Sequence, residues 1–113
     1  MQNVVEIDIK SEGQTVSLAL GEFLIEVERL KFLNQRVLIK VITGYGSHGK
    51  GGEIKKELSK LLYKLKKEEK ISYFSSCEKL TKDELHSLCE KFPDLILDTE
   101  VSSYNSGVTL VVV

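Results

Sequence analysis

The residues from Thr43 to Gly52 hold the densest set of groups in this chain that could bind a phosphate. They read Thr43-Gly44-Tyr45-Gly46-Ser47-His48-Gly49-Lys50-Gly51-Gly52 and contain five glycines, an imidazole and an amine. Glycine permits backbone conformations and close approaches that a side chain would obstruct. Backbone N–H groups at the start of a helix, together with His48 and Lys50, can bind a phosphodiester. We call this segment the glycine loop and expect it to contact phosphate groups.

The glycine loop also matches parts of two nucleotide-binding patterns. Gly44-x-Gly46-x-x-Gly49 fits the dinucleotide fingerprint, but that fingerprint usually follows the first strand of a larger fold with two nucleotide-binding halves. Gly44-x-x-x-x-Gly49-Lys50 fits the phosphate-loop pattern except at its last position, where Gly51 replaces the Ser or Thr that would hold magnesium. Both mismatches favour the phosphate of a polymer, and we expect no nucleotide cofactor.

Asp8 and His48 are the two residues that could cleave a phosphodiester. Cleavage needs a base or a metal ion to activate the nucleophile, donors for the developing charge and an acid for the leaving oxygen. If the strands that precede these two residues are neighbours, the carboxylate and the imidazole could face one phosphate. A divalent ion, Mg²⁺ or Mn²⁺, could take part in that case, and the sequence indicates no other cofactor.

Other side chains near the glycine loop are candidates for binding rather than cleavage. Lysines recur at four-four-three spacing after it, at Lys56, Lys60, Lys64 and Lys67, and so share one face of a helix. The first two of these lysines are nearest to the loop. The candidate nucleic-acid contacts are Lys10, Gly44, Tyr45, Gly46, Ser47, Lys50, Gly51, Gly52, Lys56 and Lys60.

Each candidate also has a purely structural interpretation, and these interpretations stay open. His48 could bond nearby backbone, Asp8 could accept N–H groups of a loop, and Tyr45 could pack on the sheet instead of stacking on a base. The lysine face could simply be solvated and balanced by glutamates. His86 and Cys89 do not make a zinc site on their own, so we expect no resident metal site.

Hydrophobic periodicity predicts the elements that must position these groups. The first half is predicted to hold a strand over 3–9, a helix from a Thr15 cap to about Asn34, a strand over 37–42 and a helix from about Glu53. The second half is predicted to hold a short strand over 71–74, a helix that a Thr81/Glu84 capping box starts and that ends before Pro93, and two strands over 95–102 and 108–113 joined by a hairpin turn at 104–107. This order, β-α-β-α-(β)-α-β-β, predicts an α/β fold: a small two-layer α/β sandwich with a mixed sheet, in a single domain over 1–113.

The glycine loop resembles the glycine-histidine loop of the small MutS-related (Smr) domains. The similar pattern is Thr43-Gly44-x-Gly46-x-His48-x-x-Gly51-Gly52, between a buried strand and a lysine-rich helix. Ile7-Asp8-Ile9 with Thr15-Val16 resembles the family's opening strand and helix start, and 107–111 resembles its closing strand. The resemblance covers nearly the whole chain, and it implies a compact α/β sandwich in a family of DNA-nicking, RNA-cleaving or simply RNA-binding modules.

The chain departs from the family pattern in two places. Where the family commonly has Leu-Asp-Leu-His-Gly, this chain has Ile7-Asp8-Ile9-Lys10-Ser11, so a histidine and a glycine are missing. Lys10 is a poor general base near neutral pH, because an unperturbed lysine has a pKa of about 10.4, although it can hold a phosphate. Residues from about 72 to 93 are interpreted as a helical insertion. Binding is therefore better supported than cleavage.

Composition limits the classes of protein to which this chain can belong. Its 113 residues, 42% of them hydrophobic and 29% charged, are typical of one globular domain. The formal net charge is −1, so nucleic-acid binding would have to depend on a local patch. The first residues show no leader pattern, no apolar run reaches membrane-spanning length, and the two cysteines lack the spacing of a secreted disulfide scaffold. We therefore expect a cytoplasmic protein without a membrane partner.

These observations predict an Smr-like domain that binds RNA or DNA through its glycine loop and lysine-rich helix. Endonuclease activity is left open, because the residues support cleavage less well than binding. The alternative is a protein-interaction module without catalytic activity on the same fold, since a fold does not fix a function. The sequence does not define a protein partner for that alternative.

Overall fold

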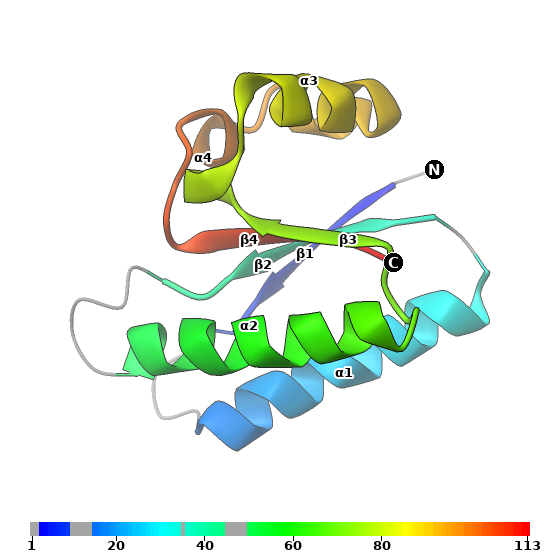
Figure 1. The fold of residues 1–113 in the computed structure, drawn as a ribbon, viewed down its shortest axis with the longest axis vertical. Helices are drawn as coiled ribbons and strands as arrows, with labels where there is room; N and C mark the ends of the chain where they lie inside the picture. Colours follow the sequence, from blue (N-terminus) through cyan, green and yellow to red (C-terminus); the bar gives the residue numbers. More distant parts are fainter. Residues whose placement is uncertain (1–2, 10–14, 35, 45–49) are drawn as a thin grey trace.

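Four strands form one mixed sheet, and helices lie on both of its faces (Figure 1). The computed structural model of the chain describes residues 3–9, 15–34, 36–44 and 50–113. The strands are β1 (Val4–Asp8), β2 (Leu38–Ile42), β3 (Tyr73–Ser76) and β4 (Val108–Val112). The helices are α1 (Val16–Phe32), α2 (Lys50–Lys67), α3 (Lys82–Lys91) and α4 (Thr99–Ser102), with short 3₁₀ turns at η1 (Cys77–Lys79) and η2 (Pro93–Leu95).

The strand order β1-β2-β4-β3 brings three strand ends to one edge of the sheet. β1 runs parallel to β2, whereas β4 is antiparallel to both β2 and β3. β1, β2 and β3 therefore run in the same direction, and their carboxyl ends lie where β4 begins. We call this end of the sheet, where Asp8, Ile42 and Ser76 end their strands and Val108 begins β4, the loop edge.

Side chains along each strand point alternately to the two faces of the sheet, so the interior consists of two cores. On one face, Ile39, Val41 and Val111 pack with apolar residues of α1 and α2. On the other face, Leu38 and Leu110 pack with apolar residues of η1, α3, η2 and α4. Burial of both faces explains why β2 is almost continuously apolar.

α1 forms because its sequence provides a cap for the start of the helix and apolar residues at helical spacing on its buried side. The Thr15 hydroxyl accepts a hydrogen bond from the backbone N–H of Leu18 at 3.2 Å and caps the helix. Its buried residues recur at helical spacing: Ala19, Phe23, Val27 and Leu30. The helix ends at Phe32, and Asn34 adopts a left-handed φ of 52° just beyond the C-cap, as the sequence predicts for this helix end.

α3 begins with the capping box that the sequence predicts. The Thr81 hydroxyl accepts from the N–H of Glu84 at 3.1 Å, and the Glu84 carboxylate accepts from the N–H of Thr81 at 3.2 Å. The side chains of Leu88 and Phe92 then pack in the core on the face of the sheet away from α1 and α2. A local signal therefore defines the start of α3, and tertiary packing holds the helix on the sheet.

The structure confirms the predicted α/β fold class with its mixed sheet. The packing of α1 and α2 on one face of the sheet is the predicted two-layer α/β sandwich. The segment interpreted as an insertion, 72–93, supplies β3 and α3 and helps to cover the second face. Among the described residues, no helix combines the length and the apolar character that crossing a membrane requires.

The strand predicted over 95–102 is wrong. The chain forms the end of η2 and α4 there, because the Asp98 carboxylate accepts from the N–H groups of Glu100 and Val101 at 3.0 and 3.1 Å and caps α4. Val101 is fully buried, as a strand residue would be, but in a helix packed on the sheet. The turn at 104–107 therefore joins α4 to β4 and is not a hairpin turn.

Gly21→Ala is expected to raise the free energy of unfolding by about 0.5–1 kcal/mol, because alanine restricts the unfolded chain and favours the helix. Gly21 lies within α1, and a methyl group there would have no heavy atom within 4 Å outside its own stretch of helix. Urea unfolding of the dilute protein, followed by circular dichroism, measures the change. A loss of stability would contradict the open position that the structure gives Gly21.

Candidate functional site

β1 and β2 bring Asp8 to the start of the glycine loop. In their parallel register Asp8 is the Cα partner of Ile42, and the N–H of Ile9 donates to the carbonyl oxygen of Ile42 at 3.0 Å. Asp8 is exposed and, by the alternation of β1, lies on the face of the sheet away from α1 and α2. The expectation that β1 and β2 are neighbours is confirmed, and because Thr43 follows Ile42 directly, Asp8 lies at the same edge as the start of the loop.

Several of the predicted site residues lie outside the described part of the chain. These are Lys10, Tyr45, Gly46, Ser47 and His48. The proximity of His48 to Asp8 therefore stays a prediction.

The end of the glycine loop is helical. Lys50, Gly51 and Gly52 form the first turn of α2, which begins three residues before the predicted start at Glu53. The N–H groups of a first helical turn have no partner within the helix, and they can bind an anion. Glycines at this turn leave those N–H groups uncovered by side chains.

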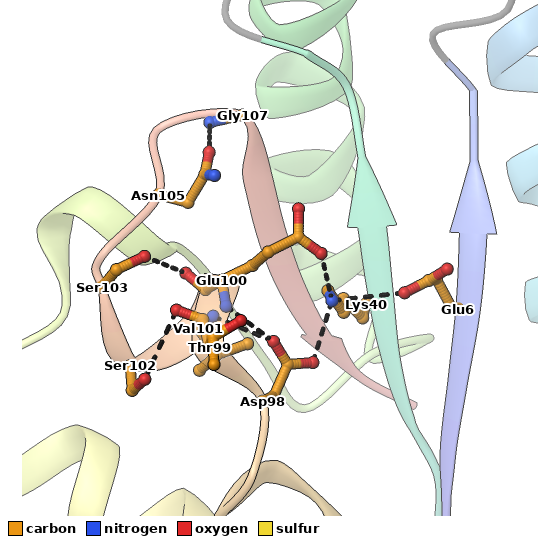
Figure 2. A network of polar contacts seen from close by, with 10 residues as sticks. All are labelled: Glu6, Lys40, Asp98, Thr99, Glu100, Val101, Ser102, Ser103, Asn105 and Gly107. Carbon is orange, nitrogen blue, oxygen red and sulfur yellow. Dashed lines mark hydrogen bonds and ion pairs between the residues drawn. The ribbon is translucent and has the colours of Figure 1, made fainter.

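Gly107 fixes the first two residues of the glycine loop. Its carbonyl oxygen accepts from the N–H groups of Thr43 at 2.9 Å and of Gly44 at 3.2 Å. Gly44 has a φ of 80°, a region that favours glycine. A methyl group on Gly107 would lie 2.9 Å from the carbonyl carbon of Gly44, so this approach needs glycine at 107 as well. The Asn105 side chain accepts from the N–H of Gly107 at 2.7 Å and holds the turn before β4 (Figure 2).

Lys55 joins α2 to the same turn. Its ammonium donates to the carbonyl oxygen of Ser106 at 2.7 Å and pairs with the carboxylate of Glu78 in η1. The hydrogen bond from Lys55 holds the pKa of Glu78 below its usual range. The role of Lys55 could not be predicted, because no spacing in the sequence shows that this position of the helix meets a turn 51 residues further on.

The ammonium of Lys40 lies almost buried in the middle of the sheet. Lys40 is only 4% exposed and belongs to β2. Three carboxylates meet it, those of Glu6 on β1 at 3.2 Å, of Asp98 at 2.9 Å and of Glu100 at 2.8 Å (Figure 2). Because a buried charge must be paired, these contacts tie β1, β2 and α4 together.

Opposing effects determine the pKa values in this cluster. Burial alone would lower the pKa of Lys40, but hydrogen bonds to the three carboxylates outweigh it and raise that pKa. Burial alone would raise the pKa of Asp98, but the hydrogen bond from Lys40 and those from the N–H groups of Val101 and Glu100 hold it below its usual range. Lys40 and Asp98 are therefore both charged at neutral pH.

The charge on the Asp8 face of the sheet is negative. Three carboxylates surround the single ammonium of Lys40 on this face, those of Glu6, Asp98 and Glu100. A phosphate would be repelled by this excess unless a cation intervened. Among the described residues, no three His, Cys, Asp or Glu side chains are grouped so that they could hold a metal ion.

The opposite charge is available on α2. The predicted lysine face is exposed along the helix, at Lys56, Lys60, Lys64 and Lys67. Lys60 pairs with Glu57 at 3.1 Å, an exposed contact that water and salt weaken. The α2 side of the loop edge is therefore the side that favours a polyanion.

Neither cysteine is arranged as a nucleophile. Cys77 is fully buried, and burial raises its pKa to about 12. Cys89 is half-buried, and burial raises its pKa as well. A thiol with a raised pKa is protonated at neutral pH and reacts poorly as a nucleophile.

A pocket of about 480 Å³ lies between the sheet and α3, away from the loop edge. Arg36, Tyr73 and Glu84 are among the residues that line it. Tyr73 pairs with Val112 at the opposite end of β3 from Ser76, so this pocket lies at the other end of the sheet. It does not belong to the site around Asp8 and the glycine loop.

Comparison of this chain with protein-family models, with curated proteins and with solved structures found no match in any of the three. The functional interpretation therefore rests on the residues of the loop edge.

Gly107→Ala is expected to lower the free energy of unfolding by about 1–3 kcal/mol, because the added methyl group forces the backbone of Gly107 and Gly44 apart. Urea unfolding measures the loss. Gly21→Ala is the matched control, since the same substitution in open space should stabilise the chain. A neutral result for Gly107→Ala would show that this contact does not hold the start of the loop.

Asp98→Asn is expected to lower the free energy of unfolding by about 1–3 kcal/mol at neutral pH, because the amide keeps an oxygen for the α4 cap but loses the charge that faces Lys40. The pKa of Asp98 is depressed in the folded state. Its contribution is therefore present above the unfolded pKa of about 3.9 and is lost as pH falls through the folded value. The stability difference between the two proteins should shrink below about pH 4 in urea unfolding.

Asp94→Asn is the control for that experiment. Asp94 is exposed on η2, and its substitution should change stability by less than about 0.5 kcal/mol. If the stability difference caused by Asp98→Asn did not change with pH, the charged pairing with Lys40 would be wrong.

Proposed function

We propose that this domain binds RNA or DNA at the loop edge, with the glycine loop and the first turn of α2 contacting phosphates. The observation that carries the proposal is the parallel register of β1 and β2, which sets Asp8 beside Ile42 at the start of the loop. Open α/β sheets commonly bind ligands beyond the carboxyl ends of their strands. The loop edge combines that location with a helix N-terminus, which favours anions.

The phosphate contacts in this proposal come from the α2 side. Lys50, Gly51 and Gly52 supply backbone N–H groups, and Lys56 and Lys60 supply exposed ammonium groups nearby. The negative face around Lys40 repels phosphates and so directs the polymer toward α2. Because the net charge of the chain is −1, binding depends on this patch and weakens as salt rises.

The resemblance to Smr domains supports the same site and adds roles for the loop. We propose an Smr-like domain in which His48 and Ser47 contact phosphate, Gly44 and Gly46 allow its approach, and Tyr45 stacks on a base. Lys10, two residues after the end of β1 in the sequence, is proposed to hold a further phosphate in place of the histidine of the family motif.

Endonuclease activity is the part of the proposal that depends on Asp8 and His48 meeting at one phosphate. A divalent ion, Mg²⁺ or Mn²⁺, would bind there through Asp8 and phosphate oxygens, since these hard ions prefer oxygen ligands. Binding does not require Asp8, so Asp8→Asn should abolish cleavage and leave binding in place. The proposed location is the cytoplasm, because Cys77 and Cys89 are both free thiols.

Lys56→Ala with Lys60→Ala is expected to weaken binding of labelled single-stranded RNA, hairpin RNA or supercoiled DNA in gel-shift titrations. Each lysine that contacts a phosphate contributes about one unit to the slope of log affinity against log salt, so the slope should fall by about 2. Lys64→Ala with Lys67→Ala removes the same charge further along α2 and should change affinity much less. If the two double variants weakened binding equally, the nucleic acid would not bind specifically at the loop edge.

The same titrations with Mg²⁺, Mn²⁺ or chelator report cleavage. Metal-dependent products that Asp8→Asn and His48→Ala each abolish would establish a nuclease, whereas retarded but intact substrate would leave a binding domain. His48→Ala should also weaken binding if the glycine loop contacts phosphate. No shift with any substrate would contradict the proposal and favour a protein-interaction module.

A further inference from the structure

α1 has an apolar stripe on its solvent side. Leu18, Ile25 and Phe32 are 62%, 70% and 89% exposed, and they are spaced seven residues apart. Residues at that spacing lie on nearly the same side of a helix. The core side of α1, with Phe23 and Val27, is opposite to them. A surface helix normally has polar residues on its outer side, so an apolar stripe there indicates an interaction surface.

Within the described residues, the chain itself leaves this stripe uncovered. Lys31, on another side of α1, donates to the carbonyl oxygen of Lys70 at 3.1 Å, just beyond the end of α2. Figure 1 shows α1 and α2 side by side on the face of the sheet away from α3 and α4. α2 therefore packs beside α1, and the stripe faces outward.

We propose that the stripe is the interface of a symmetric dimer, in which α1 packs antiparallel against α1 of a second copy of this chain. The spacing is self-complementary, because Leu18 and Phe32 are each seven residues from Ile25. A two-fold axis at Ile25 sets each Leu18 against Phe32 of the second copy and brings the two Ile25 side chains together. Two-fold dimers use the same patch on both subunits, as this pattern requires.

Charged residues beside the stripe fit the same antiparallel register. Glu22 and Arg29 are exposed and lie along one flank of the stripe, seven residues apart. The axis at Ile25 brings Glu22 within one residue of Arg29 of the second copy, and symmetry forms this pair twice. Arg29 already pairs with Glu26 in its own chain, and its guanidinium has further N–H donors for a second carboxylate. This charge complementarity favours a second copy of the chain as the occupant of the stripe.

The dimer is expected to be weak and independent of nucleic-acid binding. One pair of helices gives an interface at the lower end of the size range of specific complexes, so association depends on concentration. The stripe lies on the outer side of α1, whereas the proposed phosphate contacts come from the glycine loop and α2. The proposal therefore stands or falls separately from the proposed function.

Sedimentation equilibrium of the whole chain over a range of concentrations tests the dimer. The wild-type mass should rise from one chain toward two. Ile25→Lys should weaken association at least about tenfold, because two ammonium groups would meet at the axis. Ile96→Lys is the matched control, since Ile96 is 62% exposed between η2 and α4, on the other face of the sheet, and should behave as wild type.

Circular dichroism confirms that each variant is folded. A one-chain mass for the wild type at every concentration would overturn the proposal. Equal weakening by Ile25→Lys and Ile96→Lys would overturn it too, because it would place the interface elsewhere.

Charge reversal tests the antiparallel register. Glu22→Arg alone sets arginines against each other at both ends of the interface, and Arg29→Glu alone sets glutamates against each other. Each variant alone should therefore stay monomeric. Mixed in equal amounts, the two variants regain opposite charges at both ends, and the mass should return toward two chains. A mixture that stays monomeric while the wild type associates would overturn the antiparallel arrangement.

Discussion

A buried ammonium in the middle of β2 ties together segments that lie far apart in the sequence. Lys40 interrupts a strand that is otherwise apolar and covered on both faces, and a buried charge is tolerated only when opposite charges pair with it. Glu6 meets Lys40 because the two are partners in the parallel register of β1 and β2. Asp98 and Glu100 come from much later in the chain, so the need to neutralise Lys40 fixes α4 over the sheet.

The position of α4 in turn determines the geometry of the loop edge. From α4 the chain returns to the sheet through a short turn, and Gly107 then accepts hydrogen bonds from Thr43 and Gly44. Lys55 bonds to the carbonyl oxygen of Ser106, so α2 is held against the same turn. The start of the glycine loop and the body of α2 are thus fixed before any ligand arrives, and such preorganisation lowers the entropic cost of binding.

The sequence predicts the parts of this structure that local signals determine. Alternation in β1, the Thr15 cap of α1 and the capping box of α3 act within a few residues, and all three predictions are confirmed. The segment over 95–102 was predicted wrongly because its apolar run resembles a strand and outweighed the local Asp98 cap of α4. The Lys40–Glu100 contact that also holds this segment spans 60 residues and has no local signal. The candidate site also has a predictable part and an unpredictable part. The adjacency of Asp8 to the start of the loop follows from strand order, whereas Lys55 meets its partners only through tertiary packing.

The central claim is that nucleic acid binds at the loop edge, and an NMR titration of the labelled domain with single-stranded RNA and with a DNA duplex tests it most directly. The account predicts saturable, salt-sensitive shifts in the backbone amides of Asp8, Thr43, Gly44 and Gly107 and in the first turns of α2, with little change in α3. Shifts confined to α1 or α3, or none at all with either polymer, would contradict it.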